Sequence, residues 1–410
     1  MAKTMRMPFL RSAIILVVAF FMVNAHTEAK EITAGVILDI TGPGGMCGQP
    51  NYLGIHDTFQ HANDHNLIPG ITLKTVVYDT QYNAAKTAPA FHFCRSKGAK
   101  VLFAIYLHDV EALKPLAEED EIPVFAYNSS VLSTQLPSWV FSQTPLVEDI
   151  SGASIQWLLS NWDYKKEGGP PNVATIGWDN ALGNTYTKTV EKIANSDSMK
   201  QRLNWKGKIV VPPRTVDYLQ PVRQLNEWET DWLAVGCIPA ATIPLMKLRK
   251  ANNGRFRMLW GDWGQVMWGF VKARAGDAIL GHCWITTFGW WNQPDKGIQK
   301  ARAILKKYRK KEEIQRLKLL EGMDYLIGIG MGDAVVEAIK TAAAQVGPNR
   351  VNGKAIYEQL QKLRIDTQGI VSPMTFTKTK RTGSDLVRVY EMDSKGDPVV
   401  VRDWFNLVEK

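Results

Sequence analysis

The feature that most constrains this fold is a regular alternation of short aliphatic runs with longer helical patterns. In the first part of the chain, strands are predicted at 32–38, 71–78, 101–105 and 124–126. Helices are predicted between them, at 52–66, 86–97 and 110–121. Each strand ends in polar or glycine-rich residues. This order predicts an α/β fold, in which a parallel sheet is covered by helices on both faces.

The same alternation begins again after Thr144. Helices are predicted at 150–162, 185–194, 219–228 and 243–251, with strands at 172–177, 208–211, 232–235 and 256–260. Two such units in sequence predict two lobes with a cleft between them, and ligands of open parallel sheets bind beyond the carboxyl ends of the strands.

The last part of the chain is expected to complete both lobes. After Gly281 we predict an aromatic strand running to Trp291, a basic helix at 301–318, helices at 325–346 and 354–363, and two terminal β segments. These elements are too many for a tail, so the chain is expected to cross between the lobes more than once.

Composition and motifs exclude several classes of protein. The 410 residues are 45% hydrophobic and 22% charged, which is typical of a two-domain globular protein, and a net charge of +9 is too small to indicate a nucleic-acid partner. The cysteines at 47, 94, 237 and 283 form no C-x-x-C pair, so neither a disulfide framework nor a zinc site is predicted. Without a Walker loop, an H-E-x-x-H or a G-x-S-x-G motif, an enzyme has no recognisable catalytic residues here.

The N-terminus has the order of a secretory signal peptide, assigned to residues 1–29. Lys3, Arg6 and Arg11 precede an apolar run at 12–23 that is short for a membrane-spanning helix. Cleavage is expected after Ala25 or Ala29, and an uncleaved membrane anchor is the alternative. The mature protein is therefore expected to be soluble and exported to the periplasm.

A series of short motifs carries a family resemblance. They occur in the order Ile32-Thr-Ala-Gly-Val-Ile-Leu-Asp-Ile-Thr-Gly-Pro43, Val77-Tyr-Asp-Thr-Gln81, Ile122-Pro-Val-Phe125, Trp139-Val-Phe-Ser142, Trp178-Asp-Asn-Ala-Leu-Gly183, Ala275-Gly-Asp-Ala278 and Gly369-Ile-Val-Ser-Pro-Met-Thr-Phe376. In this order and spacing they closely resemble the periplasmic solute-binding proteins of the branched-chain amino acid type. The resemblance covers nearly the whole mature chain.

The resemblance implies a type I periplasmic binding fold with two lobes and three hinge crossings. The crossings are expected near 143–145, 283–285 and 384–386, which assigns 31–144 plus 284–385 to one lobe and 145–283 plus 386–410 to the other. It also implies a monomeric carrier without cofactors. Such a carrier hands a small solute to the permease subunits of an ABC importer. A sensor of the same fold is the alternative, and a periplasmic enzyme comes third.

In the first lobe, the resemblance indicates three loops that touch the solute. Cys47 stands where the family has an aromatic contact, so it either makes room for a larger ligand or belongs to a turn whose shape alone matters. Tyr106, His108 and Asp109 follow the third strand, where His108 or Asp109 could bond the solute or cap the next helix. The third loop, in which backbone and hydroxyl groups would hold a carboxylate, contains Asn128, Ser129 and Ser130.

In the second lobe, the expected contacts depart from the family pattern. Asp179 opens a motif whose usual aromatic is Leu182 here, and Cys237 replaces a frequent tyrosine. The acid that binds an amino-acid ammonium should fall near Asp262, but Trp263 occupies the most favoured register. Losing that acid would be costly for a desolvated ammonium, which puts an amino-acid ligand in doubt.

Tryptophans at 260, 263, 268, 284, 290 and 291 fall in a stretch that should border the cleft. Two or three of them, with Trp290 among the candidates, are expected to face the ligand, while Trp268 and Trp284 fit core positions. The expected ligand is an amphipathic carboxylate, either an aromatic acid or a hydrophobic amino acid.

Two further patterns are assigned structural roles. His61 and His65, with Asp57 on the same helix face, have a spacing that can bind metal, but an exposed helix face explains it better. Close helix packing explains the Gly328–Gly332 run better than a dinucleotide loop does. The basic run that begins at Lys306 is interpreted as a solvated helix face, with docking to a membrane partner as the alternative.

Overall fold

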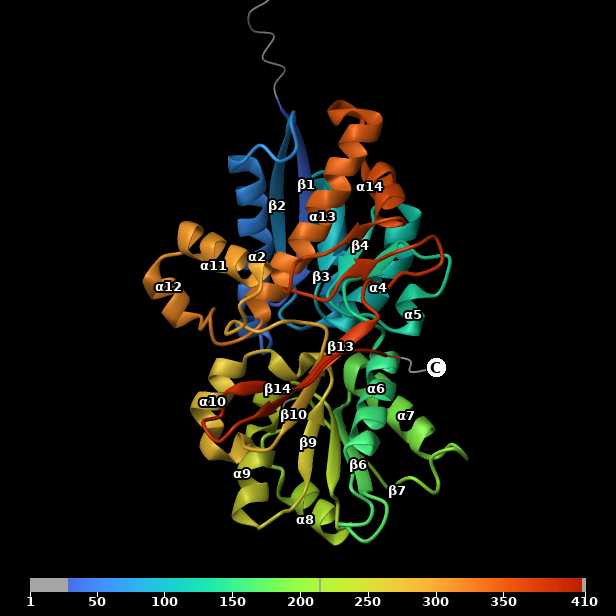
Figure 1. Ribbon diagram of the computed structural model, residues 1–410. Coiled ribbons are helices and arrows are strands. Elements are labelled where there is room, and N and C mark those ends of the chain that lie inside the picture. Colours follow the sequence, from blue (N-terminus) through green and yellow to red (C-terminus); the bar gives the residue numbers. More distant parts are fainter. Residues whose placement is uncertain (1–28, 214, 408–410) are drawn as a thin grey trace, which may run out of the picture.

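The computed structural model describes residues 29–213 and 215–407, which form two α/β lobes stacked one above the other (Figure 1). The predicted signal peptide lies outside the described residues except for Ala29. Within the described ranges, no helix is both long enough and apolar enough to span a bilayer.

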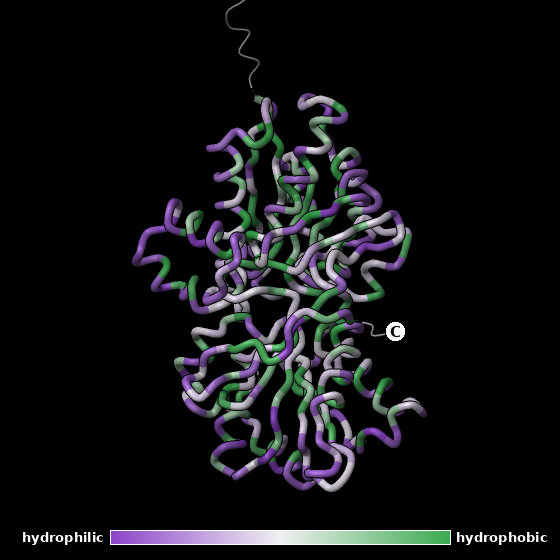
Figure 2. The backbone as a smooth tube through the Cα atoms, in the orientation of Figure 1, coloured by the Kyte–Doolittle hydropathy of each residue, from purple (hydrophilic) through white to green (hydrophobic). Residues whose placement is uncertain are grey.

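The first lobe contains a five-stranded sheet in the order β2-β1-β3-β4-β5, and all its strand pairs are parallel as predicted. Its strands are β1 (Lys30–Leu38), β2 (Ile71–Asp79), β3 (Ala99–Ala104), β4 (Val124–Ala126) and β5 (Val140–Ser142). The connecting helices are α2 (Gly45–Asp64), η1 (Ala84–Lys86), α3 (Thr87–Ser96), α4 (Leu107–Glu119) and α5 (Val131–Thr134). Aliphatic strand residues fill its core, and the backbone in this lobe includes stretches coloured hydrophobic in Figure 2.

The second lobe contains a seven-stranded sheet in the order β14-β13-β10-β9-β8-β6-β7. Its strands are β6 (Asn172–Trp178), β7 (Asn204–Val211), β8 (Trp232–Gly236), β9 (Arg257–Trp260), β10 (Cys283–Thr286), β13 (Leu386–Met392) and β14 (Pro398–Asn406). Its helices are α6 (Val147–Ser160), α7 (Ala181–Ala194), α8 (Leu219–Glu227), η2 (Pro239–Thr242), α9 (Ile243–Ala251), η3 (Asp262–Gln265), α10 (Trp268–Ala275) and η4 (Gly276–Ile279).

The prediction that both sheets are parallel is wrong for one edge of the second sheet. Strand β13 pairs antiparallel with β10, and β14 pairs antiparallel with β13. The reason is the chain path, because β10 leaves the second lobe and β13 returns from the first lobe beside it. A short turn then reverses the chain into β14.

The chain passes between the lobes after β5, after β10 and before β13 (Figure 1). The first passage lies between β5, which ends at Ser142, and α6, which begins at Val147, and the third precedes Leu386. The second passage follows Thr286, because 283–286 form a strand of the second sheet. We expected the chain to enter the first lobe at residue 284. It enters that lobe only after Thr286, where β10 ends.

The remaining elements cover the first lobe. They are α11 (Lys296–Tyr308), α12 (Lys311–Arg316), α13 (Asp324–Val346), η5 (Pro348–Arg350), α14 (Gly353–Leu360), β11 (Arg364–Ile365) and β12 (Met374–Thr375). The single basic helix predicted at 301–318 is wrong, because Arg309 has an extended backbone that separates α11 from α12. Its guanidinium turns inward and forms a buried ion pair with Asp57 on α2.

Helices α2 and α13 cross in close contact. A Cβ placed at Gly328 would lie 2.1 Å from the carbonyl oxygen of Asn51, and one placed at Gly54 would lie 2.3 Å from the carbonyl oxygen of Tyr325. Only glycine allows the two backbones to approach this closely. The predicted packing role of the 328–332 run is therefore confirmed.

Candidate functional site

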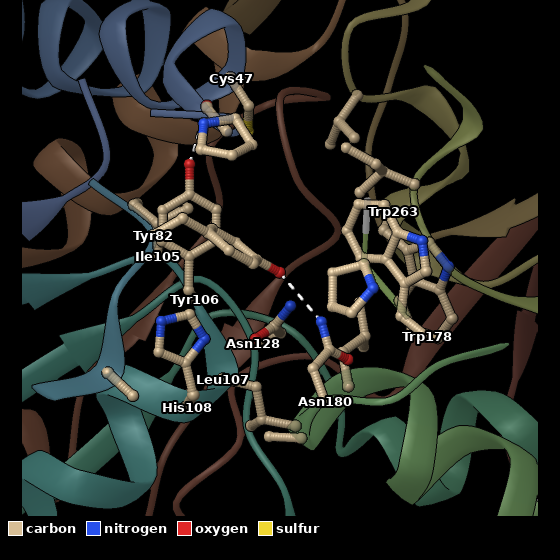
Figure 3. A pocket seen from close by; sticks show the side chains of 18 of the residues that line it. Cys47, Tyr82, Ile105, Tyr106, Leu107, His108, Asn128, Trp178, Asn180 and Trp263 are labelled. Atoms are coloured by element: carbon tan, nitrogen blue, oxygen red, sulfur yellow. Dashed lines mark hydrogen bonds between the residues drawn. The ribbon is translucent and has the colours of Figure 1, made fainter. Parts of the chain in front are cut away.

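A cavity of about 610 Å³ lies between the two lobes. Its lining residues follow β1, β2, β3 and β4 in the first lobe and lie at or beyond the ends of β6, β7, β8 and β9 in the second. Several of them are drawn in Figure 3. The carboxyl ends of parallel strands from both sheets thus meet at one place, which is where such folds bind ligands.

Tyr82 is the aromatic side chain that joins the two walls of the cavity. Gln81 and Tyr82 both have left-handed backbones, with φ of 53° and 56°, which side-chain-bearing residues rarely adopt. The Tyr82 ring lies edge-on to Tyr106 at 4.9 Å and to His108 at 5.0 Å between centroids. Its hydroxyl accepts a 3.1 Å hydrogen bond from Asn180 Nδ2 in the other lobe (Figure 3).

Two further hydrogen bonds join the lobes beside the cavity. The Tyr127 hydroxyl donates to the carbonyl oxygen of Asp262 at 2.9 Å. The backbone N–H of Met267, itself in a left-handed conformation with φ of 56°, donates to Asp324 Oδ2 at 2.9 Å. These bonds form only when the lobes are together, so the structure shows the lobes closed over the cavity.

The lining contains no Lys, Arg, Asp or Glu side chain among the described residues. Its polar side-chain groups are tyrosine hydroxyls, the Cys47 thiol, the amides of Asn128 and Asn180, the His108 ring and the indole N–H groups of Trp178 and Trp263. Burial lowers the pKa of His108 to about 4, so this ring is neutral at physiological pH. Asn128 Oδ1 is buried without a hydrogen-bond partner, which leaves it available to a ligand.

Four buried carboxyl groups stand behind the cavity wall, and among the described residues none of them pairs with Lys or Arg. Burial raises the pKa of Asp109 to about 7, that of Asp262 to about 6 and that of Asp324 to about 6. Burial also raises the pKa of Asp39, which accepts the backbone N–H groups of Gly42 and Gly44, each at 2.6 Å. None of these four residues lines the cavity, and their hydrogen bonds hold the segments around it.

The structure places six of the residues suggested by sequence on the cavity wall, namely Cys47, Tyr106, His108, Asn128, Leu182 and Trp263. Seven others lie outside the lining, namely Asp109, Ser129, Ser130, Asp179, Cys237, Asp262 and Trp290.

Each of these seven has another environment. Asp109 is buried next to His108, with 3.7 Å from its Oδ2 to Nε2, and accepts a hydrogen bond from Thr87. Ser129 and Cys237 are fully buried. Ser130 caps α5 and donates to Glu111.

Of the remaining three, Asp179 and Asp262 lie in the second lobe, and Trp290 follows β10 and packs on Trp284. Asp179 is exposed and accepts from Asn184. Asp262 receives the Thr287 N–H at 2.8 Å and the Thr286 hydroxyl at 2.6 Å, which turns its carboxylate away from the cavity.

The tryptophan cluster contributes less to the cavity than predicted. Of its six members only Trp263 lines the wall, so the expectation of two or three is wrong. Trp268 packs on Trp284 at 4.6 Å, and Trp284 packs on Trp290 at 5.7 Å between ring centroids. The predicted core positions of Trp268 and Trp284 are thus confirmed, and Trp290 joins the same aromatic core.

Sequence reasoning did not find the other wall residues. They are Pro43, Gly44, Tyr82, Ala84, Ile105, Leu107, Tyr127, Trp178, Asn180, Ala181, Pro212, Pro213, Ile238 and Val266. All lie at strand ends or in the loops that follow them, so the rule that located the cleft would have pointed to these loops but not to the individual side chains.

No group of three or more His, Cys, Asp or Glu side chains suited to a metal ion occurs in the part of the chain that the structure describes. Asp57, which shares a helix face with His61 and His65, accepts hydrogen bonds from Arg309 and Tyr325 through its carboxylate.

Comparisons with known proteins agree with this architecture. A branched-chain amino acid ABC transporter from Thermus thermophilus with bound valine superposes with a TM-score of 0.80 at 21% identity, covering 92% of this chain and 97% of that chain. A fatty acid ABC transporter substrate-binding protein from Thermomonospora curvata gives 0.77 at 18%, covering 92% of each chain.

A solute binding protein of an ABC transporter from R. palustris in complex with benzoate gives a TM-score of 0.73 at 15% identity, covering 91% of this chain and 96% of that chain. No curated protein matches the sequence. These structures confirm the type I fold. Residues 31–397 match the family described as periplasmic binding protein, and the chain belongs to that family.

Proposed function

We propose that this protein is the extracytoplasmic solute-binding component of an ABC importer, which captures a small amphipathic carboxylate between its two lobes. The observation that carries the proposal is the cavity formed by strand ends of both lobes and bridged by the Tyr82–Asn180 hydrogen bond. A solute that contacts both walls would stabilise the closed form, which is how hinged binding proteins signal occupancy. The partners are the permease subunits of the importer, and turnover of the solute is not expected.

The wall chemistry favours an aromatic or aliphatic acid over an amino acid. An amino acid would bring an ammonium group into a cavity whose lining offers no carboxylate, and an unpaired buried charge is expensive. The apolar and aromatic wall, including Trp178, Trp263 and Ile105, suits a ring or an alkyl chain. Among the similar structures, one holds valine, one holds benzoate and one is a fatty acid ABC transporter substrate-binding protein. Of these three ligand classes, benzoate best fits an uncharged aromatic wall.

The carboxylate itself would be held by helix N-termini and Asn128. Residues Leu107 and His108 open α4, and Ala181 and Leu182 open α7, so the first turns of two helices from opposite lobes line the cavity. First-turn N–H groups have no carbonyl partner within their helix and attract anions. A carboxylate placed between them would need no Lys or Arg.

The test is a thermal-shift screen of the mature protein with benzoate-type acids, medium-chain fatty acids, branched-chain amino acids and quaternary amines. A monocarboxylate at about a hundred times its Kd should stabilise the protein by roughly 2.7 kcal/mol. Trp263→Ala should reduce that shift, whereas Asp179→Asn, an exposed neighbour of the wall, should leave it unchanged. Stabilisation by amino acids alone would contradict the assigned ligand class, and stabilisation by amines alone would contradict an anionic ligand.

A further inference from the structure

The segment 296–318 has a net positive charge almost equal to that of the entire chain. It contains ten Lys and Arg residues against two Glu, a formal excess of eight, whereas the entire chain has a net charge of +9. The rest of the molecule is therefore almost neutral. This segment comprises α11, α12 and the residues that join them, and we call it the basic protrusion because it projects sideways from the first lobe (Figure 1).

About half of these charges are not neutralised within the fold. Lys300 pairs with Asp333, Lys307 with Asp64, Lys318 with Glu321, and Arg309 with Asp57. Arg302 forms no ion pair with a described residue but donates to the Trp291 carbonyl oxygen and lies over the Trp291 ring. The other exposed cations of the protrusion without an ion pair to a described residue are Lys296, Lys306, Lys310, Lys311 and Arg316. The hydrophilic colour of this region in Figure 2 reflects the same surface.

The fold presents these cations outward on a fixed support. The apolar side of α11, with Ile298, Ile304 and Leu305, is buried against the lobe, and Lys296 and Lys306 are exposed. The Arg309–Asp57 ion pair anchors the joint between α11 and α12 to α2. The charges are thus held on a rigid extension and not on a mobile tail.

The chemistry of the protrusion fits a sheet of anionic headgroups. Apart from Arg302, four of the five unpaired cations are lysines, which act as point charges and do not require the fixed two-pronged geometry of an Arg–carboxylate pair. They are spread along two helices and do not converge on a pocket. Leu320, 37% exposed, and the half-buried Ile314 and Leu317 lie in and just after α12, where they can enter the headgroup layer. We propose that the basic protrusion docks this protein on an anionic lipid surface.

The test is vesicle flotation of the mature protein with no solute added, so that its outcome is independent of the proposed ligand. Vesicles containing phosphatidylglycerol are compared with vesicles of phosphatidylcholine alone, at low and at physiological salt. Each lysine near an anionic surface adds about 1 kcal/mol, or about fivefold in binding. The triple variant Lys306→Glu, Lys310→Glu and Lys311→Glu should therefore lose at least about 100-fold in partitioning, and salt should weaken the binding of the wild type.

A matched variant distinguishes binding through the basic protrusion from a general effect of the net charge of the protein. Lys165→Glu, Lys188→Glu and Lys192→Glu change the net charge equally at exposed, unpaired positions of the second lobe, and this variant should retain most of the binding. Equal losses in both triple variants, or no preference for phosphatidylglycerol in the wild type, would overturn the proposal. Tighter binding to soluble polyglutamate than to anionic vesicles would overturn it as well, because it would identify an acidic protein as the partner.

Discussion

The crossing of α2 and α13 gives the sharpest stability prediction, because two glycines of one helix differ only in what surrounds them. In Gly328→Ala the new Cβ would lie 2.1 Å from the Asn51 carbonyl oxygen and 3.0 Å from the Gly54 Cα, both backbone atoms. The helices would have to separate by about 1 Å, and overpacking of this kind costs about 1–3 kcal/mol. Because both obstacles are backbone, we expect the upper end of that range.

Alanine also gains about 1 kcal/mol in helix propensity over glycine, so the net loss for Gly328→Ala is about 2 kcal/mol. In Gly330→Ala the nearest atom is the end of the Gln143 side chain at 2.9 Å, and the next is 3.6 Å away. That flexible amide can move, so the same propensity gain should leave this variant as stable as the wild type or slightly more stable.

The assay is thermal unfolding of both variants and the wild type, followed by circular dichroism. At about 2–4 °C per kcal/mol, Gly328→Ala should melt about 4–8 °C below the wild type. Helix α2 also carries Cys47 of the cavity wall in its first turn, so the stabilisation by solute should fall in the same variant. A Gly328→Ala protein that melts at or above Gly330→Ala would refute the backbone-contact argument.

Three other predictions concern single side chains. Tyr82→Phe removes the hydrogen bond from Asn180, worth about 0.5–1.5 kcal/mol, so calorimetry should show two- to tenfold weaker binding of a stabilising carboxylate, and unchanged affinity would exclude a role in closure. Burial raises the pKa of Asp109 from 3.8 to about 7, because the folded protein favours the neutral carboxyl group. The folded state is therefore not destabilised by this group below about pH 4, and it loses stability as the pH rises through 7. Asp109→Asn should therefore gain a few kcal/mol over the wild type in urea unfolding between about pH 4 and 8, and a pH-independent difference would contradict this. Asp57→Ala removes the buried partner of Arg309 and leaves this guanidinium only Glu313, 3.6 Å away. It should cost about 3–5 kcal/mol in urea unfolding, whereas the exposed-pair control Lys307→Ala should change little; equal effects would argue against a buried ion pair.

The sequence predicts the strands and helices well because apolar periodicity is a local property. The strand at 124–126 and the helix at 243–251 match the structure to the residue. The predicted single helix at 301–318 failed because Arg309 is drawn to Asp57, more than two hundred residues earlier in the chain. No local pattern records that contact.

The cavity shows the same division between local and tertiary information. The loops at strand ends could be predicted, and Asn128 and Trp263 lie in two of them. The direction of each side chain could not, since Thr286 and Thr287 turn the Asp262 carboxylate away while its neighbour Trp263 faces inward. Tyr82 was missed because its position depends on two successive left-handed residues, for which neither Gln81 nor Tyr82 gives a sequence signal.

The placement of tryptophan gives this protein an intrinsic optical reporter. Of its 14 tryptophans, Trp178 and Trp263 alone line the cavity among the described residues, and both belong to the second lobe. Filling the cavity changes the polarity around these two indoles and leaves the packed Trp268–Trp284 pair in its core environment. Emission at the red edge of the tryptophan spectrum would then report occupancy without any attached dye, and Trp263→Phe would show how much of the signal comes from Trp263 and how much from Trp178.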